Sequence, residues 1–210
     1  DEAQSGDIFE ALGIGRAANH MLGDDNPVSN VGYPVVAKIV SPDIAHKTEA
    51  SGVILNIQND DELKIVSKSL RARIAKSHPN AHIEGILVQR MEQGLAEVLV
   101  GYRGSSETGP IITLALGGTL AEIYNDASVR LAPVNKASAL EMIEEVKGLG
   151  PIRGYRGMPK GDLEALAEAI VNLSALAASS KISEAEINPL IVKGEGEGVV
   201  AVDGLIILYN

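Results

Sequence analysis

The sequence predicts a mixed α/β protein of two lobes, and three observations support this fold class. The 210 residues are 45% hydrophobic but include only one Phe and no Trp, so the core must be built from Ile, Val, Leu and Ala, which suits packed α/β layers. Short β-branched runs alternate with longer stretches of helical periodicity. A polar segment at residues 91–94 separates two strand-rich blocks. We therefore expect two lobes with a cleft between them, where ligand sites tend to form.

The charge balance argues against several classes of partner. With 28 acidic and 18 basic residues the formal net charge is −10, so we expect no nucleic-acid partner and no anionic membrane surface. No apolar run approaches the length of a membrane-spanning helix. Cysteine is absent, which excludes disulfides and thiol chemistry and fits a cytoplasmic location. The chain starts with Asp rather than Met, which indicates a processed chain or a segment of a longer one.

The first block is expected to begin with a frayed stretch and a short helix. Residues 1–6 are polar, residues 8–12 form a short helical face, and residues 17–32 are expected to be a loop. Asn59 is the predicted N-cap of the clearest helix, with Glu62 three residues later as in a capping box. The remaining elements predicted in this block are strands at residues 33–40, 53–57 and 83–90 and that helix at residues 59–76.

The second block is expected to contain more strands and two helices. Gly117 and Gly118 follow one of the strands, and paired glycines allow backbone N–H groups to approach an anion closely. The alternative is an ordinary tight turn. The elements predicted here are strands at residues 96–102 and 110–116, helices at residues 135–147 and 162–179, and a hairpin that ends the chain.

Two residues of the first block have the chemistry of a phosphate site. Lys38 interrupts an otherwise apolar strand, and a buried lysine is costly unless it meets a negative partner. The alternative is that Lys38 lies on a solvated face. His46 stands with Lys47 and Thr48 in the loop SPDIAHKTEASG, where it is either a solvated loop residue or a participant in chemistry. The pattern alone leaves both alternatives open.

The most informative stretch lies near the end of the chain. Two apolar runs, residues 187–192 and 199–202, flank the loop KGEGEG, which predicts a β-hairpin. Centring the loop between Glu195 and Gly196 fixes the register. That register gives three opposed pairs, Val192 with Val199, Leu190 with Ala201 and Asn188 with Asp203.

Asn188 and Asp203 are candidate metal ligands because of this register. Side chains alternate across a strand, so the three pairs are expected to share one face, with opposed Cβ atoms about 4.5–5.5 Å apart. One amide oxygen and one carboxylate would then lie together above an apolar platform. These are the oxygen ligands that Mg²⁺ prefers when substrate phosphates complete its shell. The alternative is that Asn188 starts a turn and Asp203 ends a strand.

Seven segments, taken in order, carry a resemblance to a known family: VVAKIVSPDIAHKT, ILVQRM, EVLVG, LGGTLAEIYNDASVRLAPV, GYRG, EINPL and AVDG. From about residue 33 to residue 203 the chain resembles the ATP-grasp nucleotide-binding subunit or domain of ADP-forming acyl-CoA synthetases. It is close to the β-subunit of archaeal-type ADP-forming acetyl-CoA synthetase and more distantly similar to that of succinyl-CoA synthetase. The resemblance implies an ATP-grasp fold of two lobes with the nucleotide site between them. The lobes would be residues 17–93 and 94–210, with residues 1–16 packed on the second.

The resemblance also implies roles for individual residues. Arg130 matches the catalytic arginine of an FRLAP-type motif, and His46 matches a histidine proposed to carry phosphate on a mobile loop. Asn188 and Asp203 match two Mg²⁺ ligands, in agreement with the hairpin register. Residues implied to bind the nucleotide are Lys38, Val88, Gln89, Arg90, Met91, Glu97, Gly117 and Gly118, with the backbone of Val88 to Met91 as the adenine hinge.

The chain departs from the family pattern in four places. The loop after His46 ends in Ser51-Gly52 rather than Gly-Gly. The sequence GSSETG at residues 104–109 replaces an acidic-Pro-x-Phe-Gly loop, and Leu114-Ala115 replaces Phe-Gly before the glycine pair. A loop-like stretch, HMLGDDNPVSN, replaces the helix that usually precedes GYPVV. The lysine, histidine, hinge and metal positions match the family.

The activity implied by the resemblance is a reversible acid–thiol ligation, acyl-CoA + ADP + phosphate ⇌ acid + CoA + ATP, with Mg²⁺ and a phosphohistidine relay. This chain would supply the nucleotide half, and a CoA-binding α-subunit or fused domain with its own phosphohistidine would supply the rest, in a hetero-tetramer. One alternative is a stand-alone ATP-grasp carboxylate ligase. The other is a non-catalytic nucleotide sensor, like the synthetase-like region of some protein acetyltransferases.

Overall fold

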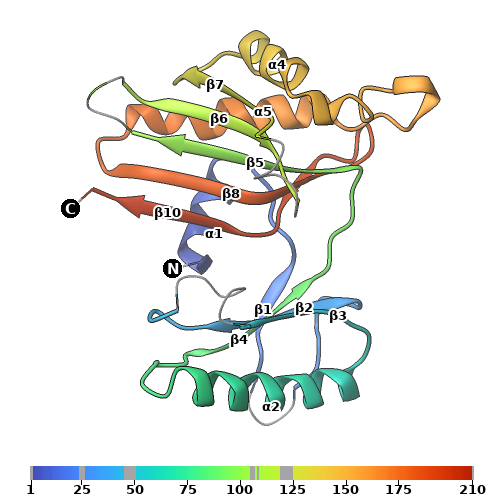
Figure 1. Ribbon diagram of the computed structural model, residues 1–210, viewed down its shortest axis with the longest axis vertical. Coiled ribbons are helices and arrows are strands. Elements are labelled where there is room, and N and C mark those ends of the chain that lie inside the picture. The colour runs from blue at the N-terminus through green and yellow to red at the C-terminus, as the bar shows by residue number, and fades with distance from the viewer. Residues whose placement is uncertain are drawn as a thin grey trace. The chain divides into compact units, whose positions relative to one another are not determined.

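The computed structural model describes residues 2–23, 27–44, 51–104, 107, 109–118 and 125–209, which form two compact units. The small unit comprises residues 17–91, and the large unit comprises residues 1–16 together with residues 92–210. Each unit has a hydrophobic core of its own, and strands and helices follow one another along the chain (Figure 1). The predicted mixed α/β class is therefore confirmed.

The small unit is a four-stranded antiparallel sheet covered by one long helix. Its strand order is β1-β4-β2-β3, and helix α2 packs against β2 and β3. The residues of α2 that lie in the core recur every three or four positions, as the amphipathic pattern predicts. The elements are β1 (Asn19–Met21), β2 (Val35–Val40), β3 (Val53–Ile57), β4 (Gly85–Arg90) and α2 (Asp60–Ser77).

Helix α2 begins where its capping residues predict. The Asn59 side chain accepts a hydrogen bond from the Glu62 N–H at 2.9 Å. The Glu62 carboxylate accepts one from the Gln58 N–H at 2.8 Å, so the capping box is shifted by one residue from its usual reciprocal form. Acidic side chains in the first turn also interact favourably with the helix dipole. The predicted helix and its cap are thus confirmed.

The large unit is built on a six-stranded antiparallel sheet. The order is β10-β8-β5-β6-β7, and β9 pairs with the second half of β8, so one long central strand has three partners. Its strands are β5 (Ala96–Arg103), β6 (Ile111–Leu116), β7 (Ala127–Leu131), β8 (Ile182–Val192), β9 (Val199–Ala201) and β10 (Gly204–Leu208).

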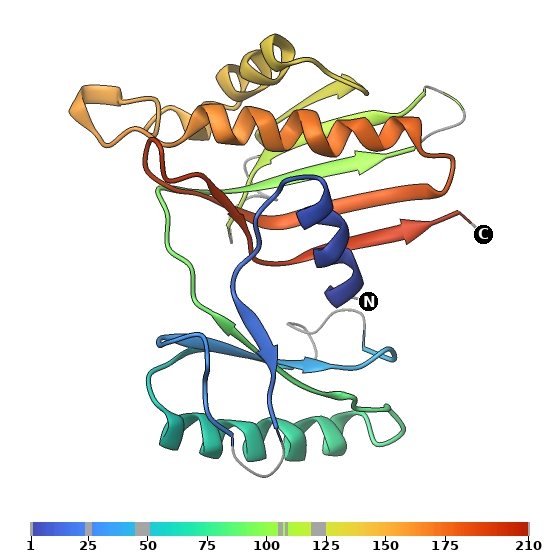
Figure 2. The ribbon, with the colours of Figure 1, turned by 180° about the vertical axis from the view of Figure 1, so that it is seen from behind.

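Three helices pack against this sheet. Helices α4 (Lys136–Glu145) and α5 (Leu163–Ser174) lie side by side over one face (Figure 1). Helix α1 (Glu2–Ala11) lies against β10 (Figure 2), where the Ser5 hydroxyl accepts a hydrogen bond from the Ile206 N–H at 3.1 Å and Phe9 enters the core. The expectation that residues 1–6 are frayed is wrong for the described part, because these contacts tie the helix to an edge strand. No helix among the described residues has the length and apolar character needed to cross a membrane.

Two short strands were not predicted from the sequence. Strand β1 lies within the stretch expected to be a loop, where it pairs with β4 as a three-residue edge strand. Strand β7 is an edge strand of the large sheet. Its polar side chains face the core side and its apolar side chains face solvent, the reverse of the usual arrangement. Ser128 is buried, while Val129 and Leu131 are 49% and 65% exposed. Strand β1 is too short to show a periodicity, and the apolar residues of β7 alternate along the strand but lie on its exposed side.

Candidate functional site

The hairpin near the end of the chain has the register that the loop predicted. Val192 pairs with Val199 and Leu190 with Ala201. The same register continues past β9, where the Asn188 N–H donates to the Asp203 carbonyl at 3.0 Å. The two candidate metal ligands are therefore directly opposite each other, as predicted.

The expectation that Asn188 shares a face with Leu190 is wrong. Leu190 is fully buried, whereas Asn188 is exposed. Strand β8 pairs Leu190 with Val98 and Ile187 with Val100, so a step of three residues in β8 matches a step of two in β5. This β-bulge inserts one residue and reverses the side on which the following side chains emerge. Asn188 therefore lies on the side of the sheet away from the core.

The donor set at this pair fits a magnesium ion that phosphates help to hold. Asn188 donates from its amide nitrogen to the Glu186 carboxylate at 3.3 Å, and the Asp203 carboxylate accepts the Gly204 N–H at 2.8 Å. Among the described residues, no three His, Asp or Glu side chains converge as a metal cluster. A site with one amide and one carboxylate oxygen leaves most positions for phosphates and water, which is the usual arrangement for Mg²⁺.

Lys38 lies in the middle of β2 and is 4% exposed, so the alternative of a solvated face is wrong. It pairs with Val53 on one side and with Leu87 on the other. Its strand neighbours Ala37 and Ile39 belong to the core under α2, so Lys38 emerges on the opposite side of the sheet. Lys38 is thus a buried charged side chain, and charged side chains are rarely buried in proteins.

The predicted adenine hinge forms the end of β4 and the residue that follows it. Val88 and Gln89 are buried within the sheet, and Arg90 is exposed. The Arg90 N–H donates to the Ala18 carbonyl at 2.8 Å and the Met91 N–H donates to the Pro34 carbonyl at 3.0 Å. These two amides are therefore bonded within the small unit, and contacts to a base would have to use other groups of the segment.

The structure brings the predicted glycine pair next to Glu97. The Gly117 N–H donates to the Glu97 carbonyl at 2.8 Å, and a Cβ at Gly117 would come within 2.8 Å of that oxygen. Gly118 has φ +89°, which favours glycine, and a Cβ there would be 4.0 Å from the Glu97 carboxylate. The local structure thus explains why both positions are occupied by glycine. Their contact with phosphate stays a prediction.

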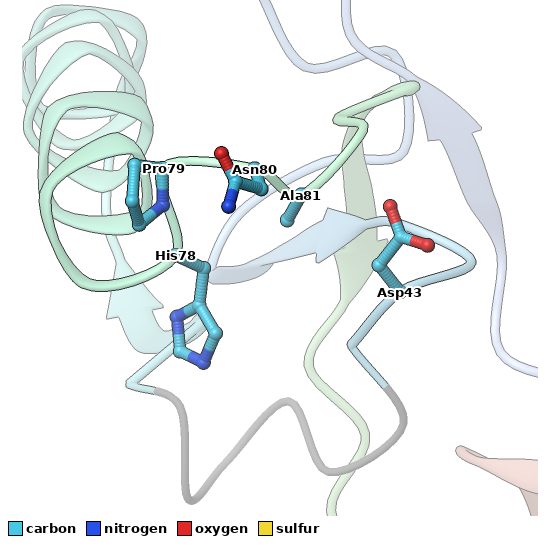
Figure 3. A pocket seen from close by; sticks show the side chains of 5 residues that line it. All are labelled: Asp43, His78, Pro79, Asn80 and Ala81. Atoms are coloured by element: carbon cyan, nitrogen blue, oxygen red, sulfur yellow. The ribbon is translucent and has the colours of Figure 1, made fainter.

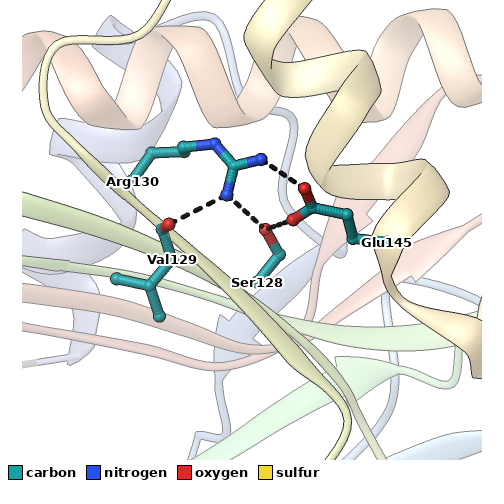
Figure 4. Close-up of polar contacts among 4 residues, drawn as sticks. All are labelled: Ser128, Val129, Arg130 and Glu145. Atoms are coloured by element: carbon teal, nitrogen blue, oxygen red, sulfur yellow. Dashed lines mark hydrogen bonds and ion pairs between the residues drawn. The ribbon is translucent and has the colours of Figure 1, made fainter.

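Arg130 is held in an ion pair on the helix-covered side of the sheet (Figure 4). Its guanidinium lies 2.5 Å from the Glu145 carboxylate, and that carboxylate also accepts the Ser128 hydroxyl at 2.6 Å. These bonds raise the pKa of Arg130 above its usual value and lower that of Glu145. Arg130 pairs across the sheet with the core residue Ile112, so it emerges on the opposite side from Asn188.

His46 and its neighbours Lys47 and Thr48 lie outside the described residues. A shallow pocket of the small unit, lined by Asp43, His78, Pro79, Asn80 and Ala81, includes none of the predicted site residues (Figure 3). The imidazole and the carboxylate that line it are well separated in Figure 3, and that carboxylate accepts a backbone N–H at 2.7 Å. We therefore assign no chemistry to this pocket.

Two anchors of the hairpin were not singled out from the sequence. Lys193 lies 2.7 Å from Glu92, a pair whose side chains are only 26% and 10% exposed and lie 101 positions apart in sequence. Asp162 caps α5 by accepting the Ala165 N–H at 3.0 Å, and its second oxygen accepts the Gly198 N–H of the hairpin loop at 2.9 Å. Only the capping role of Asp162 has a local sequence signal, because the other partners are distant along the chain.

Replacing Asp162 with Ala is expected to lower the free energy of unfolding by about 0.5–2 kcal/mol, the usual range for an N-cap. The bond from Ala165, followed by that from Gly198, lowers the pKa of Asp162 in the folded chain. A lowered folded pKa stabilises the fold above the unfolded value of about 3.9, and this contribution is lost as pH falls through the folded pKa. In urea unfolding, the difference in free energy of unfolding between the wild type and Asp162→Ala should therefore become smaller below about pH 4.

The control for this experiment is Asp162→Asn, which keeps an acceptor for the cap but does not titrate. Its free energy of unfolding at neutral pH should lie between those of the wild type and the alanine variant. Equal stability of the wild type and Asp162→Ala at pH 7 would contradict the role of Asp162 as an anchor.

A family model described as an ATP-grasp domain matches residues 1–208. The crystal structure of PH1788 from Pyrococcus horikoshii has a TM-score of 0.88 at 32% identity and covers 99% of this chain and 90% of that chain. Acetyl-coenzyme A synthetase 1 of Candidatus Korarchaeum cryptofilum, in complex with coenzyme A, Ca-AMPCP and HgCl⁺, has a TM-score of 0.88 at 31% identity, with 99% and 92% covered.

Curated relatives identify the branch of the family. The β-subunit of ADP-forming acetate–CoA ligase I from Pyrococcus furiosus is 40% identical over 179 residues, which are 85% of this chain and 76% of that subunit. The ADP-forming acetate–CoA ligase I of Archaeoglobus fulgidus is 38% identical over 198 residues, 92% of this chain but only 29% of the length of that ligase. The chain therefore belongs to the ATP-grasp family, in the branch of the ADP-forming acetate–CoA ligase β-subunits. The family expected from the motifs is confirmed.

Proposed function

We propose that this chain is the nucleotide-binding part of an ADP-forming acyl-CoA synthetase, which converts acyl-CoA, ADP and phosphate into acid, CoA and ATP. The observation that carries the proposal is the opposed pair of Asn188 and Asp203 in a chain 40% identical to a β-subunit of such a ligase. Phosphoryl transfer requires charge neutralisation and positioning above all. The chain offers groups for both tasks in each of its units.

In the small unit, Lys38 is proposed to neutralise nucleotide phosphates. Its burial supports this role, because a cation of low exposure attracts phosphate more strongly than a solvated one. Segment 88–91 is proposed to hold the adenine. Lys38 of β2 pairs with Leu87 of β4, the strand that carries segment 88–91. The phosphate contact and the adenine contact are therefore proposed to lie on two directly paired strands.

In the large unit, Asn188 and Asp203 are proposed to hold Mg²⁺, with Glu97 and Gly118 nearby in the nucleotide site. When bound, the ion would neutralise phosphate charge. For Arg130, the ion pair with Glu145 supports a different role from the one the motif implies. We infer that it fixes β7 to α4 and does not itself contact phosphate.

The chemistry of the acyl group is assigned to a partner. The relative from Pyrococcus furiosus is named as a β-subunit, which implies a second subunit, and we propose that this subunit or a fused domain binds CoA and carries its own phosphohistidine. His46 is proposed to exchange phosphate with it, and the assembly is proposed to be a hetero-tetramer. A cytoplasmic location stays a prediction of the sequence.

Combining this chain with the CoA-binding part of the same ligase tests the proposal. Acetyl-CoA, ADP, phosphate and Mg²⁺ should yield ATP, measured by a luciferase assay, only when both parts are present. ATP formation by this chain alone would instead support a stand-alone ligase. Binding of nucleotide without ATP formation from any acyl-CoA, in the presence of the partner, would support the sensor alternative.

A further inference from the structure

The segment that carries the motif GYRG is the most basic part of an otherwise acidic unit. The large unit has twice as many acidic as basic residues, yet residues 146–161 contain no Asp or Glu. Residues 153–160, called here the GYRG loop, project from the helix layer between α4 and α5 (Figure 1). A concentration of one charge sign at a projecting surface favours a partner of the opposite sign. The cations of this segment are Lys147, Arg153, Arg156 and Lys160.

The base of the GYRG loop is fixed to the large unit. Arg153 is ion-paired with the Glu144 carboxylate at 2.6 Å and donates to the Val146 carbonyl at 2.9 Å. Arg153 and Lys160 also form an antiparallel bridge that closes the loop. A fixed base presents the tip in one orientation, which lowers the entropy cost of binding.

The tip of the loop holds an arginine in a backbone conformation that favours glycine. Arg156 has φ +50°, between Gly154 at +87° and Gly157 at +80°. An L-residue with a side chain pays a conformational cost in this left-handed region that glycine avoids. The fold therefore holds Arg156 in this conformation at a cost that glycine would avoid.

The contacts that the described residues offer to Arg156 are few. Its guanidinium lies over the Tyr155 ring, 5.2 Å from the ring centroid, and it forms no ion pair with any described carboxylate. Tyr155 is itself 56% exposed and Met158 is 50% exposed. Tyr, Arg and Met are enriched at the centres of protein interfaces, where stacking and apolar contact become buried. The side chains at the tip thus resemble an interface cluster that lacks its partner surface.

We propose that the GYRG loop is a docking element that places Tyr155, Arg156 and Met158 against an acidic surface with an apolar pocket on the CoA-binding subunit or domain. This inference rests on the proposed function, which supplies the partner. A protein is favoured over a phosphate ligand because the exposed apolar side chains match an interface. Within the described residues, the cations of the loop also do not converge: Arg153 is already paired with Glu144.

The test measures binding of the CoA-binding part to this chain by isothermal titration. Arg156→Glu and Tyr155→Ala should each weaken binding at least about tenfold, about 1.4 kcal/mol, and added salt should weaken the wild-type complex. Arg156→Gly should weaken binding as well, while raising the melting temperature of the isolated chain because it relieves the left-handed strain. A variant that is more stable yet binds less well cannot be explained by misfolding.

The matched control is Lys181→Glu. Lys181 is an exposed cation of the large unit, located beyond the C-terminal end of α5 and away from the GYRG loop in sequence. Lys181→Glu changes the net charge by the same amount as Arg156→Glu, and it should leave partner binding unchanged. ADP affinity, measured on every variant, should also stay at the wild-type value.

Four outcomes overturn the inference. Unchanged partner binding by Arg156→Glu, with ATP formation intact, would remove the docking role and leave the proposed function standing. A loss of ADP affinity in that variant would make the loop a nucleotide ligand. Self-association of the chain through the loop, seen by sedimentation, would make a second copy the occupant. No binding of the partner to the wild-type chain would overturn both this inference and the proposed function.

Discussion

Replacing Asp203 with Asn is expected to weaken binding of Mg·ADP at least about tenfold, while the affinity for ADP in the presence of a chelator changes little. The substitution removes the negative charge that attracts the metal but keeps an oxygen at the same place. That oxygen can still accept the Gly204 N–H, which the Asp203 carboxylate accepts at 2.8 Å, so the hairpin should keep its fold. Calorimetric titrations with and without Mg²⁺ give the two affinities.

The hairpin offers a matched control for this variant. Because Asn188 and Asp203 are directly opposite, the double variant Asn188→Asp with Asp203→Asn exchanges the two ligands and restores the charge. It should recover part of the lost Mg·ADP affinity. Equal losses in the two titrations for Asp203→Asn would exclude Asp203 as a ligand, and so would a double variant that folds normally but recovers nothing.

The hairpin is also where the sequence predicted most and where its limits are clearest. The register depends only on the loop between two adjacent strands, so centring the loop was sufficient to pair Val192 with Val199. The side on which Asn188 lies depends on the third strand, because the bulge arises in the pairing of β8 with β5. A pairing between segments about ninety residues apart has no signal in the local pattern.

The same reasoning explains the other differences. Helix α2 was predicted with its cap because Asn59 and Glu62 act within one turn. Strand β7 was missed because its polar residues face inward. Ser128 and Arg130 are satisfied by Glu145, which lies on a helix that the chain reaches only later. A motif match identified Arg130 but could not reveal that its charge is already paired.

Lys38 illustrates a case in which a local anomaly was a reliable signal. A lysine inside an apolar strand is costly wherever it lies, so its presence predicted an unusual environment, and it is 4% exposed. Which group it meets depends on the ligand and on the arrangement of the chain around it. The strand pattern left burial and a solvated face of Lys38 as alternatives, the structure decides for burial, and the contact of Lys38 with phosphate rests on the family.

His46→Asn is expected to abolish the labelling of this chain by radioactive ATP in the presence of Mg²⁺ and the CoA-binding partner. In the proposed step a neutral imidazole nitrogen attacks the γ-phosphorus, the P–N bond forms as the P–O bond to ADP breaks, and ADP leaves. His46 itself lies outside the described residues, but both neighbouring segments are fixed to the small unit. Ile44 is 5% exposed in its core, and the Gly52 carbonyl accepts the Ile39 N–H at 2.8 Å.

Because those anchors do not involve the imidazole, the variant should bind ADP with nearly wild-type affinity while losing the label completely. The label on the wild-type chain should be lost in acid and kept in base, as expected for a phosphoramidate and not for an acyl phosphate. His82→Asn is the matched control, since His82 is an exposed histidine of the same unit whose backbone N–H, and not its imidazole, donates to the Asp43 carboxylate at 2.7 Å. That variant should take up label at the wild-type rate. If His46→Asn took up label as fast as the wild type, the phosphate would be carried by another residue and the relay would not pass through His46.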